Sequence, residues 1–176
     1  MSTGAPIVKL IVAVLSKPEV DPNFVAELLA EVFGSVDFVG EPHPFDCTDY
    51  YQEEMGEDLL RYLISFSGPH HADILVSAKR ACIALEQGLA VDSKRIANLD
   101  CGYLDHHKLV LASTKGAGQK IYLEDGIYAD LVARYSNSRY EALPWGFPDF
   151  KDGRYAAELN QIRRLFKGRE LRSPKN

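Results

Sequence analysis

The spacing of hydrophobic residues constrains the fold of this chain most strongly, because it changes between strand and helix periods in a definite order. Residues 7–15 are apolar on both faces, which is typical of a strand in the middle of a sheet. Helical spacing then runs from Asp21-Pro22, where the acid can serve as N-cap, to Gly34, which suits a helix end. Residues 36–41 are predicted to form a second strand, and residues 60–66 alternate as a third.

A second helix and a fourth strand follow. Gly68-Pro69 ends the third strand, residues 73–87 have helical spacing, and residues 95–100 have strand character. Strand, helix, strand, strand, helix, strand is the order of the split βαβ arrangement. We therefore predict an α+β fold with a ferredoxin-like βαββαβ core.

The rest of the chain predicts more antiparallel strands and one more helix. Residues 108–113 and 120–124 flank a glycine-bearing turn, and residues 127–135 alternate clearly between apolar and polar. Residues 140–150 form a loop rich in aromatic residues and proline, and residues 154–166 have helical spacing. The core is thus extended by an antiparallel β-meander and a C-terminal helix.

Length and composition are those of one domain. We assign residues 1–176 to it, with an ordered core over 6–166 and a flexible basic tail over 167–176. The net charge of −5 argues against a chain-wide nucleic-acid surface, although the basic end could serve as an arm for an anionic partner. The three scattered cysteines, without a signal-peptide pattern or a membrane-length apolar run, predict a cytoplasmic protein that does not enter the membrane.

Several motifs occur in one order along the chain: Phe45-x-x-Thr48-x-Tyr50-Tyr51-x-x-Glu54-Met55-Gly56, Asn98-Leu99-Asp100-x-Gly102-Tyr103 and Trp145-x-x-Pro148-Asp149. In this combination the chain resembles a bacterial family of domains of unknown function, in which some members carry a GTP-binding label. The resemblance implies a shared fold and supplies no reaction. Family members commonly have proline at position 101 and tyrosine at positions 147 and 150, so Cys101, Phe147 and Phe150 are weak candidates for catalysis.

The first candidate site is the loop over residues 42–58, because loops of this length in compact domains are usually functional or disordered. Its polar side chains could surround a ligand; they are Asp46, Thr48, Tyr50, Tyr51 and Glu54. The alternative is purely local. Asp49 and Gln52 resemble a capping box for a short helix, and the aromatic rings could close the edge of the sheet.

The second candidate site is the end of the fourth strand, with Arg95, Asn98, Asp100 and Tyr103. Asn98 and Asp100 share one face of a strand, while Arg95 is expected on the other. Asn and Asp are poor strand formers, so either they contact a ligand or Asp100-Cys101-Gly102 forms a turn with glycine at positive φ; the turn is favoured.

Lysines and glycines elsewhere offer further possibilities. Lys79 and Glu86 share a face of the second helix, which predicts an exposed polar stripe or, alternatively, a lysine that reaches the Asn98–Asp100 strand end. Residues 113–120 lack the order of a phosphate-binding P-loop and are predicted to form a hairpin turn, although Lys115 and Lys120 could attract an anion.

The histidine spacing indicates no metal site, no nucleophile–base pair is recognisable, and the sequence specifies no cofactor. We predict binding of a small polar, phosphorylated or nucleotide-like ligand, with Arg95, Lys79 or Lys115 holding an anion. Asp100 or Glu54 would be the acid–base group if the protein is an enzyme. The alternative is an RNA- or protein-binding module that uses an open sheet face and the basic tail. The first hypothesis requires the 42–58 loop and the Asn98–Tyr103 segment to meet around a polar hollow.

Overall fold

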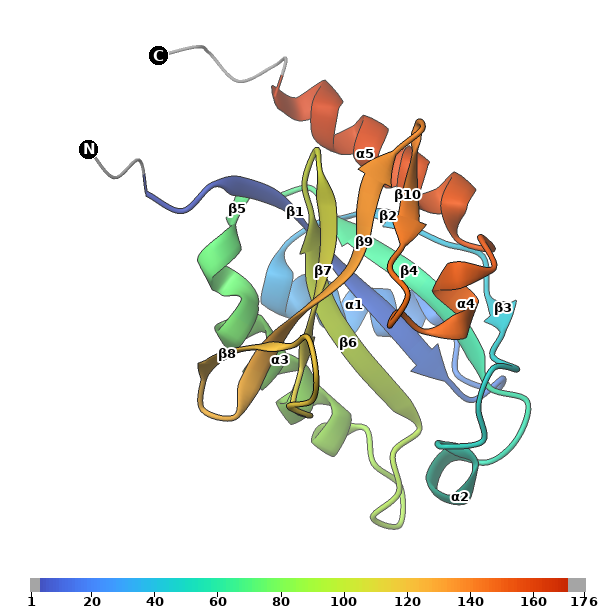
Figure 1. Cartoon of the computed structure of the whole chain (residues 1–176). Helices are drawn as coiled ribbons and strands as arrows, with labels where there is room; N and C mark the ends of the chain where they lie inside the picture. Colours follow the sequence, from blue (N-terminus) through green and yellow to red (C-terminus); the bar gives the residue numbers. More distant parts are fainter. Residues whose placement is uncertain (1–3, 171–176) are drawn as a thin grey trace.

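A computed structural model describes residues 4–170 of the chain (Figure 1). The elements are β1 (Ile7–Ser16), α1 (Pro22–Phe33), β2 (Val36–Val39), β3 (His43–Pro44), α2 (Gln52–Met55), β4 (Leu60–Phe66), β5 (His70–His71), the 3₁₀ turn η1 (Ala72–Ile74), α3 (Leu75–Gly88), β6 (Ala97–Leu104), β7 (Lys108–Ser113), β8 (Ile121–Glu124), β9 (Ile127–Ser136), β10 (Arg139–Ala142), α4 (Pro148–Lys151) and α5 (Ala156–Glu170). The predicted tail begins inside α5, and its positions 171–176 lie outside the described residues.

One large antiparallel sheet dominates the fold, which confirms the α+β class. Its main path runs β10-β9-β7-β6-β1-β4-β2, with β3 joined to β4, β5 to β1 and β8 to β9. β1 lies between β6 and β4, as its apolar sequence predicts, and its residues 10–15 are fully buried. The helix α1 starts as predicted, because Asp21 accepts a hydrogen bond from the Asn23 N–H (2.9 Å), and it ends at Gly34 with φ of 89°.

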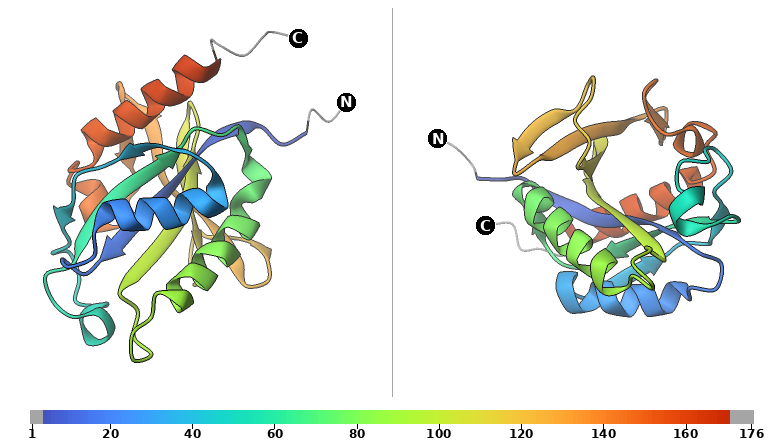
Figure 2. Two further views of the ribbon diagram at one scale, coloured as in Figure 1. Left: turned by 180° about the vertical axis from the view of Figure 1, so that it is seen from behind. Right: turned by 90° about the horizontal axis from the view of Figure 1, so that it is seen from below.

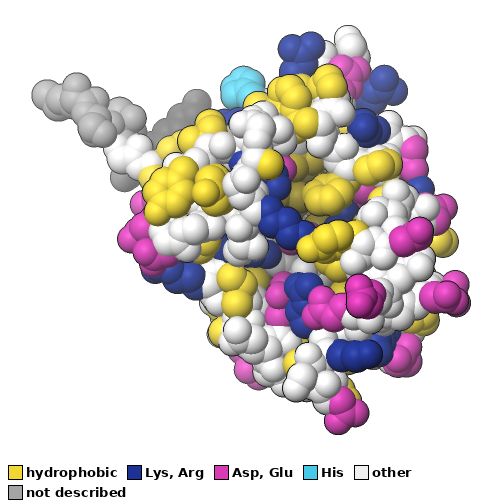
Figure 3. Space-filling view, turned by 60° about the horizontal axis from the view of Figure 1, so that its bottom comes forward, with side chains coloured by type: hydrophobic (Ala, Val, Ile, Leu, Met, Phe, Trp, Pro, Cys, Tyr) yellow, Lys and Arg dark blue, Asp and Glu magenta, His cyan; other side chains and the backbone are white. Residues whose placement is uncertain are grey.

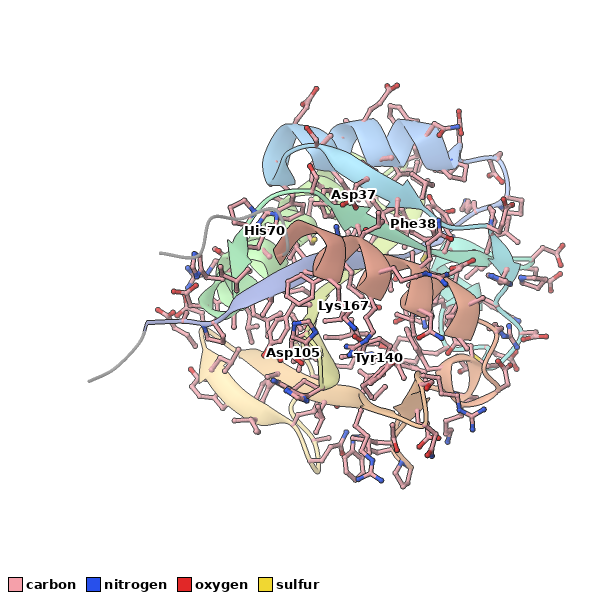
Figure 4. The ribbon with its side chains drawn as sticks, turned by 90° about the horizontal axis from the view of Figure 1, so that it is seen from above. Asp37, Phe38, His70, Asp105, Tyr140 and Lys167 are labelled. Atoms are coloured by element: carbon pink, nitrogen blue, oxygen red, sulfur yellow. The ribbon has the colours of Figure 1, made fainter. Side chains whose placement is uncertain are left out.

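Helices cover both faces of this sheet (Figure 2). On one face, α1 and α3 bury the apolar side chains that β1, β4 and β6 direct toward them. On the other face, α5 packs against β1 and β4 and beneath the curled β9–β10 end, through Leu159, Ile162 and Phe166 as predicted. In Figure 4, Asp105 and Tyr140 lie beside α5, where the Tyr140 hydroxyl donates to the Asp105 carbonyl (2.6 Å).

The predicted hairpin at residues 113–120 is wrong. Within residues 4–170, β7 and β8 do not pair with each other; both pair with β9, on its opposite edges. The 114–120 segment therefore crosses from one edge of β9 to the other instead of turning back. The tight turn lies one strand later, at Asp125 and Gly126, whose φ angles of 50° and 73° suit a two-residue hairpin loop.

The predicted turn at Asp100-Cys101-Gly102 is also wrong, because β6 runs straight through these residues. Gly102 is needed for a different reason. A Cβ atom there would lie 2.2 Å from the backbone oxygen of Val110, so only glycine lets β7 approach β6 at this point. The glycine signal in the sequence was real, but it marks a close contact between strands and not a positive φ.

Candidate functional site

The sheet opens beside Gly102. β6 pairs with β1 along its whole length, from Ala97 to Leu104, but it pairs with β7 only at Gly102, Tyr103 and Leu104. Beyond that point β7 follows β9 away from β6. We call the opening the β6–β7 cleft; it is a cavity of about 680 Å³ whose wall includes residues of α3, β6, β7, the 47–51 segment, the 113–120 loop and positions 147–148.

Figure 3 shows this face of the molecule, with basic and hydrophobic side chains around the hollow and acidic side chains along its lower rim. Both sequence-predicted segments contribute to the wall. The predicted site residues that line it are Thr48, Tyr50, Tyr51, Lys79, Arg95, Asn98, Asp100 and Lys115. The 42–58 loop and the β6 strand thus meet around a hollow whose wall is mainly apolar and carries several polar and charged side chains.

Two side chains of α3 take the place of the missing strand partner. At Leu99, the backbone N–H donates to Glu86 Oε1 (2.6 Å), and the backbone carbonyl accepts from Lys79 Nζ (3.0 Å). Lys79 and Glu86 are therefore almost fully buried, and the predicted exposed stripe is wrong. The alternative, a lysine that reaches the β6 end, describes the contact that is present. A buried strand edge requires such partners, because an unpaired backbone group is costly.

A chain of charge-assisted hydrogen bonds connects the 42–58 loop to the floor of the cleft. Glu54 accepts two hydrogen bonds from Arg95, each 2.7 Å long, and Arg95 also donates to Asn98 Oδ1 (2.8 Å). Asn98 Nδ2 in turn donates to Asp100 Oδ2 (3.0 Å), and Lys79 Nζ lies 3.3 Å from Asp100 Oδ1. Arg95 reaches the same side as Asn98, contrary to the prediction, because it precedes the first residue of β6 and is not part of its pleat.

Behind this floor lies a buried ion pair that sequence reasoning missed. Arg61 on β4 is 1% exposed, donates to Asp149 Oδ2 (3.0 Å), and approaches Asp100 Oδ2 at 3.4 Å. The Tyr155 hydroxyl also donates to Asp149 (2.8 Å), and the Phe45 ring lies under the guanidinium at 4.6 Å. The available signal was an arginine inside an otherwise apolar strand together with an aspartate inside an aromatic loop.

The mouth of the cleft carries a separate polar group, on the 113–120 loop. Lys120 Nζ donates to Ser113 Oγ (2.9 Å) and lies 3.7 Å from Asp130 Oδ2. Lys115 Nζ sits over the ring of Tyr50, 3.6 Å from its centroid, and so joins this loop to the 42–58 loop. Within residues 4–170, no carboxylate pairs with Lys115.

Comparison with known proteins assigns the chain to one family. A family model described as a domain of unknown function (DUF4416) matches residues 6–166, which include every segment of the cleft wall. The chain belongs to this family. No curated protein and no solved structure matches it.

Three predicted site residues of this DUF4416 protein lie outside the wall of the cleft. Asp46 pairs with Arg154 (2.9 Å) and faces a second surface hollow, and Tyr103 lies along the closed part of β6. Glu54 stays outside the wall but fixes Arg95. The predicted Asp49–Gln52 contact is present at 3.0 Å, although it joins the two side chains and does not cap α2.

Burial alters the acidity of two groups in the wall. It raises the pKa of the Tyr51 phenol to about 12, so the hydroxyl is a neutral hydrogen-bond donor at physiological pH. Burial also raises the pKa of Glu86, against the opposing effect of the Leu99 N–H and the Lys79 charge. The cleft of the DUF4416 protein therefore contains a protonated phenol and a carboxyl group whose ionisation is disfavoured.

Across the part of the chain that the structure describes, no three His, Cys, Asp or Glu side chains are grouped so that they could hold a metal ion. None of the helices in residues 4–170 combines the length and the apolar character that crossing a membrane requires. The three cysteines are free, and Cys82 and Cys101 are buried between α3 and β6.

Proposed function

We propose that this DUF4416 domain binds a small polar ligand, phosphorylated or nucleotide-like, in the β6–β7 cleft. The observation that carries the proposal is the cleft itself. A cavity of about 680 Å³ falls within the size range of small-molecule sites, and it combines apolar walls with a few convergent polar groups. Aromatic and cationic side chains from separate segments meet in its wall, as recognition of a ring and an anion requires.

The walls supply complementary chemistry to such a ligand. Tyr50, Tyr51 and Phe147 offer ring surfaces for a planar group. The Tyr51 hydroxyl offers a donor, and Lys115 offers a cation that pairs with no carboxylate among residues 4–170. The Lys79 and Arg95 side chains of the floor already pair with groups of the protein, so they would act mainly to hold the shape of the cleft.

We propose acid–base chemistry, should the domain be an enzyme, for Asp100 and not for Glu54. Glu54 lies outside the cavity wall, and the hydrogen bond from Arg95 keeps the pKa of Glu54 low. Asp100 lies in the wall, where a bound ligand can reach it.

We further propose that the core is ferredoxin-like. The strand order β6-β1-β4-β2, with antiparallel neighbours and with α1 and α3 on one face, supports this assignment. The face of the sheet that an RNA-binding domain of this kind would use is covered here by α5. One basic residue of the C-terminal region is also committed to the fold, because Arg163 donates to the His106 carbonyl (2.7 Å) and stacks on Tyr135.

Thermal unfolding with a ligand panel tests the proposal. Purified protein would be heated with nucleoside monophosphates, nucleosides and sugar phosphates, and its absorbance ratio at 260 and 280 nm would be recorded first. A ligand present at one hundred times its dissociation constant adds about 2.7 kcal/mol of stability. Clean absorbance together with a shift for one class of phosphorylated compound supports the proposal, whereas co-purified RNA that salt releases supports the RNA-binding alternative.

A matched pair of variants places the site. Tyr51→Ala removes one ring from the wall and is expected to weaken the ligand by about tenfold or more, because stacking on a ring contributes about 1–3 kcal/mol per base. Tyr122→Ala removes an exposed ring on β8 that is not part of the wall, and should leave affinity unchanged. Equal affinities for the two variants would contradict the proposed site.

A further inference from the structure

The charges of the cleft are distributed unevenly between its floor and its mouth. In the floor, Lys79 and Arg95 contact Asp100, Glu86 and Glu54. At the mouth, Lys115 and Lys120 face only Asp130 in the wall, so two positive charges against one negative charge leave a net charge of +1. An anionic group of a ligand is therefore favoured at the mouth and not at the floor.

We infer that the 113–120 loop is a phosphate subsite, and that it takes the phosphate group of a phosphate monoester whose organic part points toward the Tyr50, Tyr51 and Phe147 rings. This inference rests on the proposed function and adds an orientation and a chemical class to it. The groups that would contact the phosphate are the Lys115 and Lys120 ammonium groups, both in the wall of the cleft, while the Ser113 hydroxyl would hold the loop that carries them.

The loop holds these groups in place before any ligand binds. The Ser113 hydroxyl donates to the Lys115 carbonyl (3.2 Å) and accepts from the Lys115 N–H (3.1 Å) and from Lys120 Nζ (2.9 Å). Gly116 packs directly on Tyr128, since a Cβ atom there would lie 2.3 Å from the ring. Gly118 adopts a left-handed φ of 54°. A loop fixed in this way needs little ordering to bind an anion.

The position of Lys115 also sets the direction of the ligand. Its ammonium lies over the Tyr50 ring, so a phosphate that contacts Lys115 necessarily lies close to that ring. The planar part of the same molecule can then extend inward along Tyr51 and Phe147. The ring system and the phosphate would thus occupy adjacent parts of one cleft.

The charge count favours one phosphate group over three. A net charge of +1 at the mouth suits a single phosphate, which carries about −1.5 to −2 at neutral pH when esterified once. A triphosphate chain would place additional negative charge near Asp130. The subsite should therefore prefer a nucleoside monophosphate to the corresponding triphosphate in the absence of divalent cations.

Titrations with inorganic phosphate, guanosine, GMP and GTP test this inference on the full chain. The double variant Lys115→Gln, Lys120→Gln removes both ammonium groups, while the control Lys151→Gln, Lys167→Gln removes two exposed lysines outside the wall and changes the total charge equally. We expect inorganic phosphate and GMP to bind wild type and control alike, and to bind the first double variant at least tenfold more weakly. GMP should exceed both guanosine and GTP in affinity for the wild type.

The outcomes separate the two proposals. If GMP binds and Tyr51→Ala weakens it, but the two double variants behave alike, the cleft binds ligand and the phosphate subsite is wrong. The subsite is equally wrong if guanosine binds wild type as tightly as GMP, or if inorganic phosphate does not bind. Thermal unfolding of each variant without ligand confirms that it is folded.

Discussion

The centre of the sheet and the β6–β7 cleft solve the same problem in different ways. Between β1 and β4 the ladder is continuous from Ile11–Ser65 to Ser16–Leu60, and both faces are closed by apolar packing. Between β6 and β7 the ladder stops at Gly102, and side chains of α3 bond to the free strand edge. The backbone groups of Leu99 therefore stay paired although the sheet opens beside them, because a neighbouring helix supplies both a donor and an acceptor.

The two regions also differ in the kind of interaction that holds them. Apolar burial at the centre is non-directional and tolerates exchange between residues of similar volume. The floor of the cleft depends on hydrogen bonds between charged groups with fixed partners, so removing one group leaves another buried and unpaired. Substitutions in the cleft should therefore cost more than substitutions of exposed charges, and the following experiments measure how much more.

The largest effect is expected at Arg61, which links β4 at the centre of the sheet to the floor of the cleft. Arg61→Met leaves Asp149 buried without its cation and should lower the free energy of unfolding by about 3–5 kcal/mol, as urea denaturation would show. Arg139→Met breaks the exposed Arg139–Glu141 pair and should cost less than about 1 kcal/mol. Similar losses of stability for both variants would show that the buried Arg61–Asp149 pair contributes no more to the free energy of unfolding than an exposed pair.

Gly102 marks the point where the ladder stops, and a methyl group there should push the two strands apart. Gly102→Ala places a Cβ against the Val110 carbonyl and is expected to destabilise by about 1–3 kcal/mol. Gly88→Ala, at the end of α3 with open space around it, should be neutral or stabilising. Thermal unfolding of both variants distinguishes these outcomes, and an unaffected Gly102→Ala protein would refute the close approach.

The Leu99 edge can be probed by changing its acceptor. Glu86→Leu leaves the Leu99 N–H without a partner and should cost about 1–3 kcal/mol in urea denaturation. Glu86→Gln keeps an amide oxygen in the same place and should cost clearly less. If Glu86→Leu and Glu86→Gln proved equally stable, apolar packing of α3 against β6 would be sufficient and the hydrogen bond to the Leu99 N–H would not be needed.

The smallest expected effect is the contribution of Glu86 to the pH dependence of the free energy of unfolding. Because burial raises the pKa of Glu86, the folded state binds its proton more tightly than the unfolded state does. The stability associated with Glu86 is therefore present below the unfolded pKa, about 4.3, and declines as pH rises through the folded pKa. Denaturation curves of Glu86→Gln should lack this decline. The free energy of unfolding of the variant should therefore increase relative to that of the wild type as pH rises.

Asp105, outside the cleft, provides the opposite case. Burial alone would raise its pKa, but hydrogen bonds from Lys108 and from the His107 and Lys108 N–H groups bring it below the usual range. The contribution of Asp105 to the free energy of unfolding is present above its pKa in the unfolded chain, about 3.9, and is lost as pH falls through its pKa in the folded protein. Asp105→Asn should remove this loss of stability at acid pH, which denaturation curves at several pH values would show. If the free energy of unfolding fell equally with pH in wild type and Asp105→Asn, the assignment would be contradicted.

Local signals in the sequence were sufficient for the longer elements, but they were insufficient for the cleft. They also failed for residues 140–150, which were predicted to form a loop and contain most of β10 and α4. Asp21-Pro22 and Gly34 bound α1 because caps depend on neighbouring residues only. The partner strand of β6 is decided far along the chain, where β7 follows β9, and no local pattern contains that information. Lys79 and Glu86 were assigned correctly to one helix face, but whether that face meets water or an open strand edge depends on this distant pairing.

Long-range partners explain the remaining errors. Arg61 and Asp149 are 88 positions apart, so neither residue alone indicates a buried pair. Arg95 was placed on the wrong side because the strand begins two residues later than predicted, and a shift at a strand end changes which residues share a face. A meeting of the 42–58 loop with the Asn98–Tyr103 segment was predicted from their polar content, and the Glu54–Arg95 pair joins the loop to the residues just before β6.

The bonding of α3 to Leu99 has a consequence for how the cleft can be tuned. Paired strands have a fixed separation of about 4.8 Å, whereas the distance from α3 to β6 is spanned here by the reach of two flexible side chains. Shortening Glu86 by one methylene, as in Glu86→Asp, would draw the helix inward or break the bond, without altering any strand register. The dimensions of the cavity can thus be adjusted from a helix surface, one methylene at a time, while the sheet stays as it is.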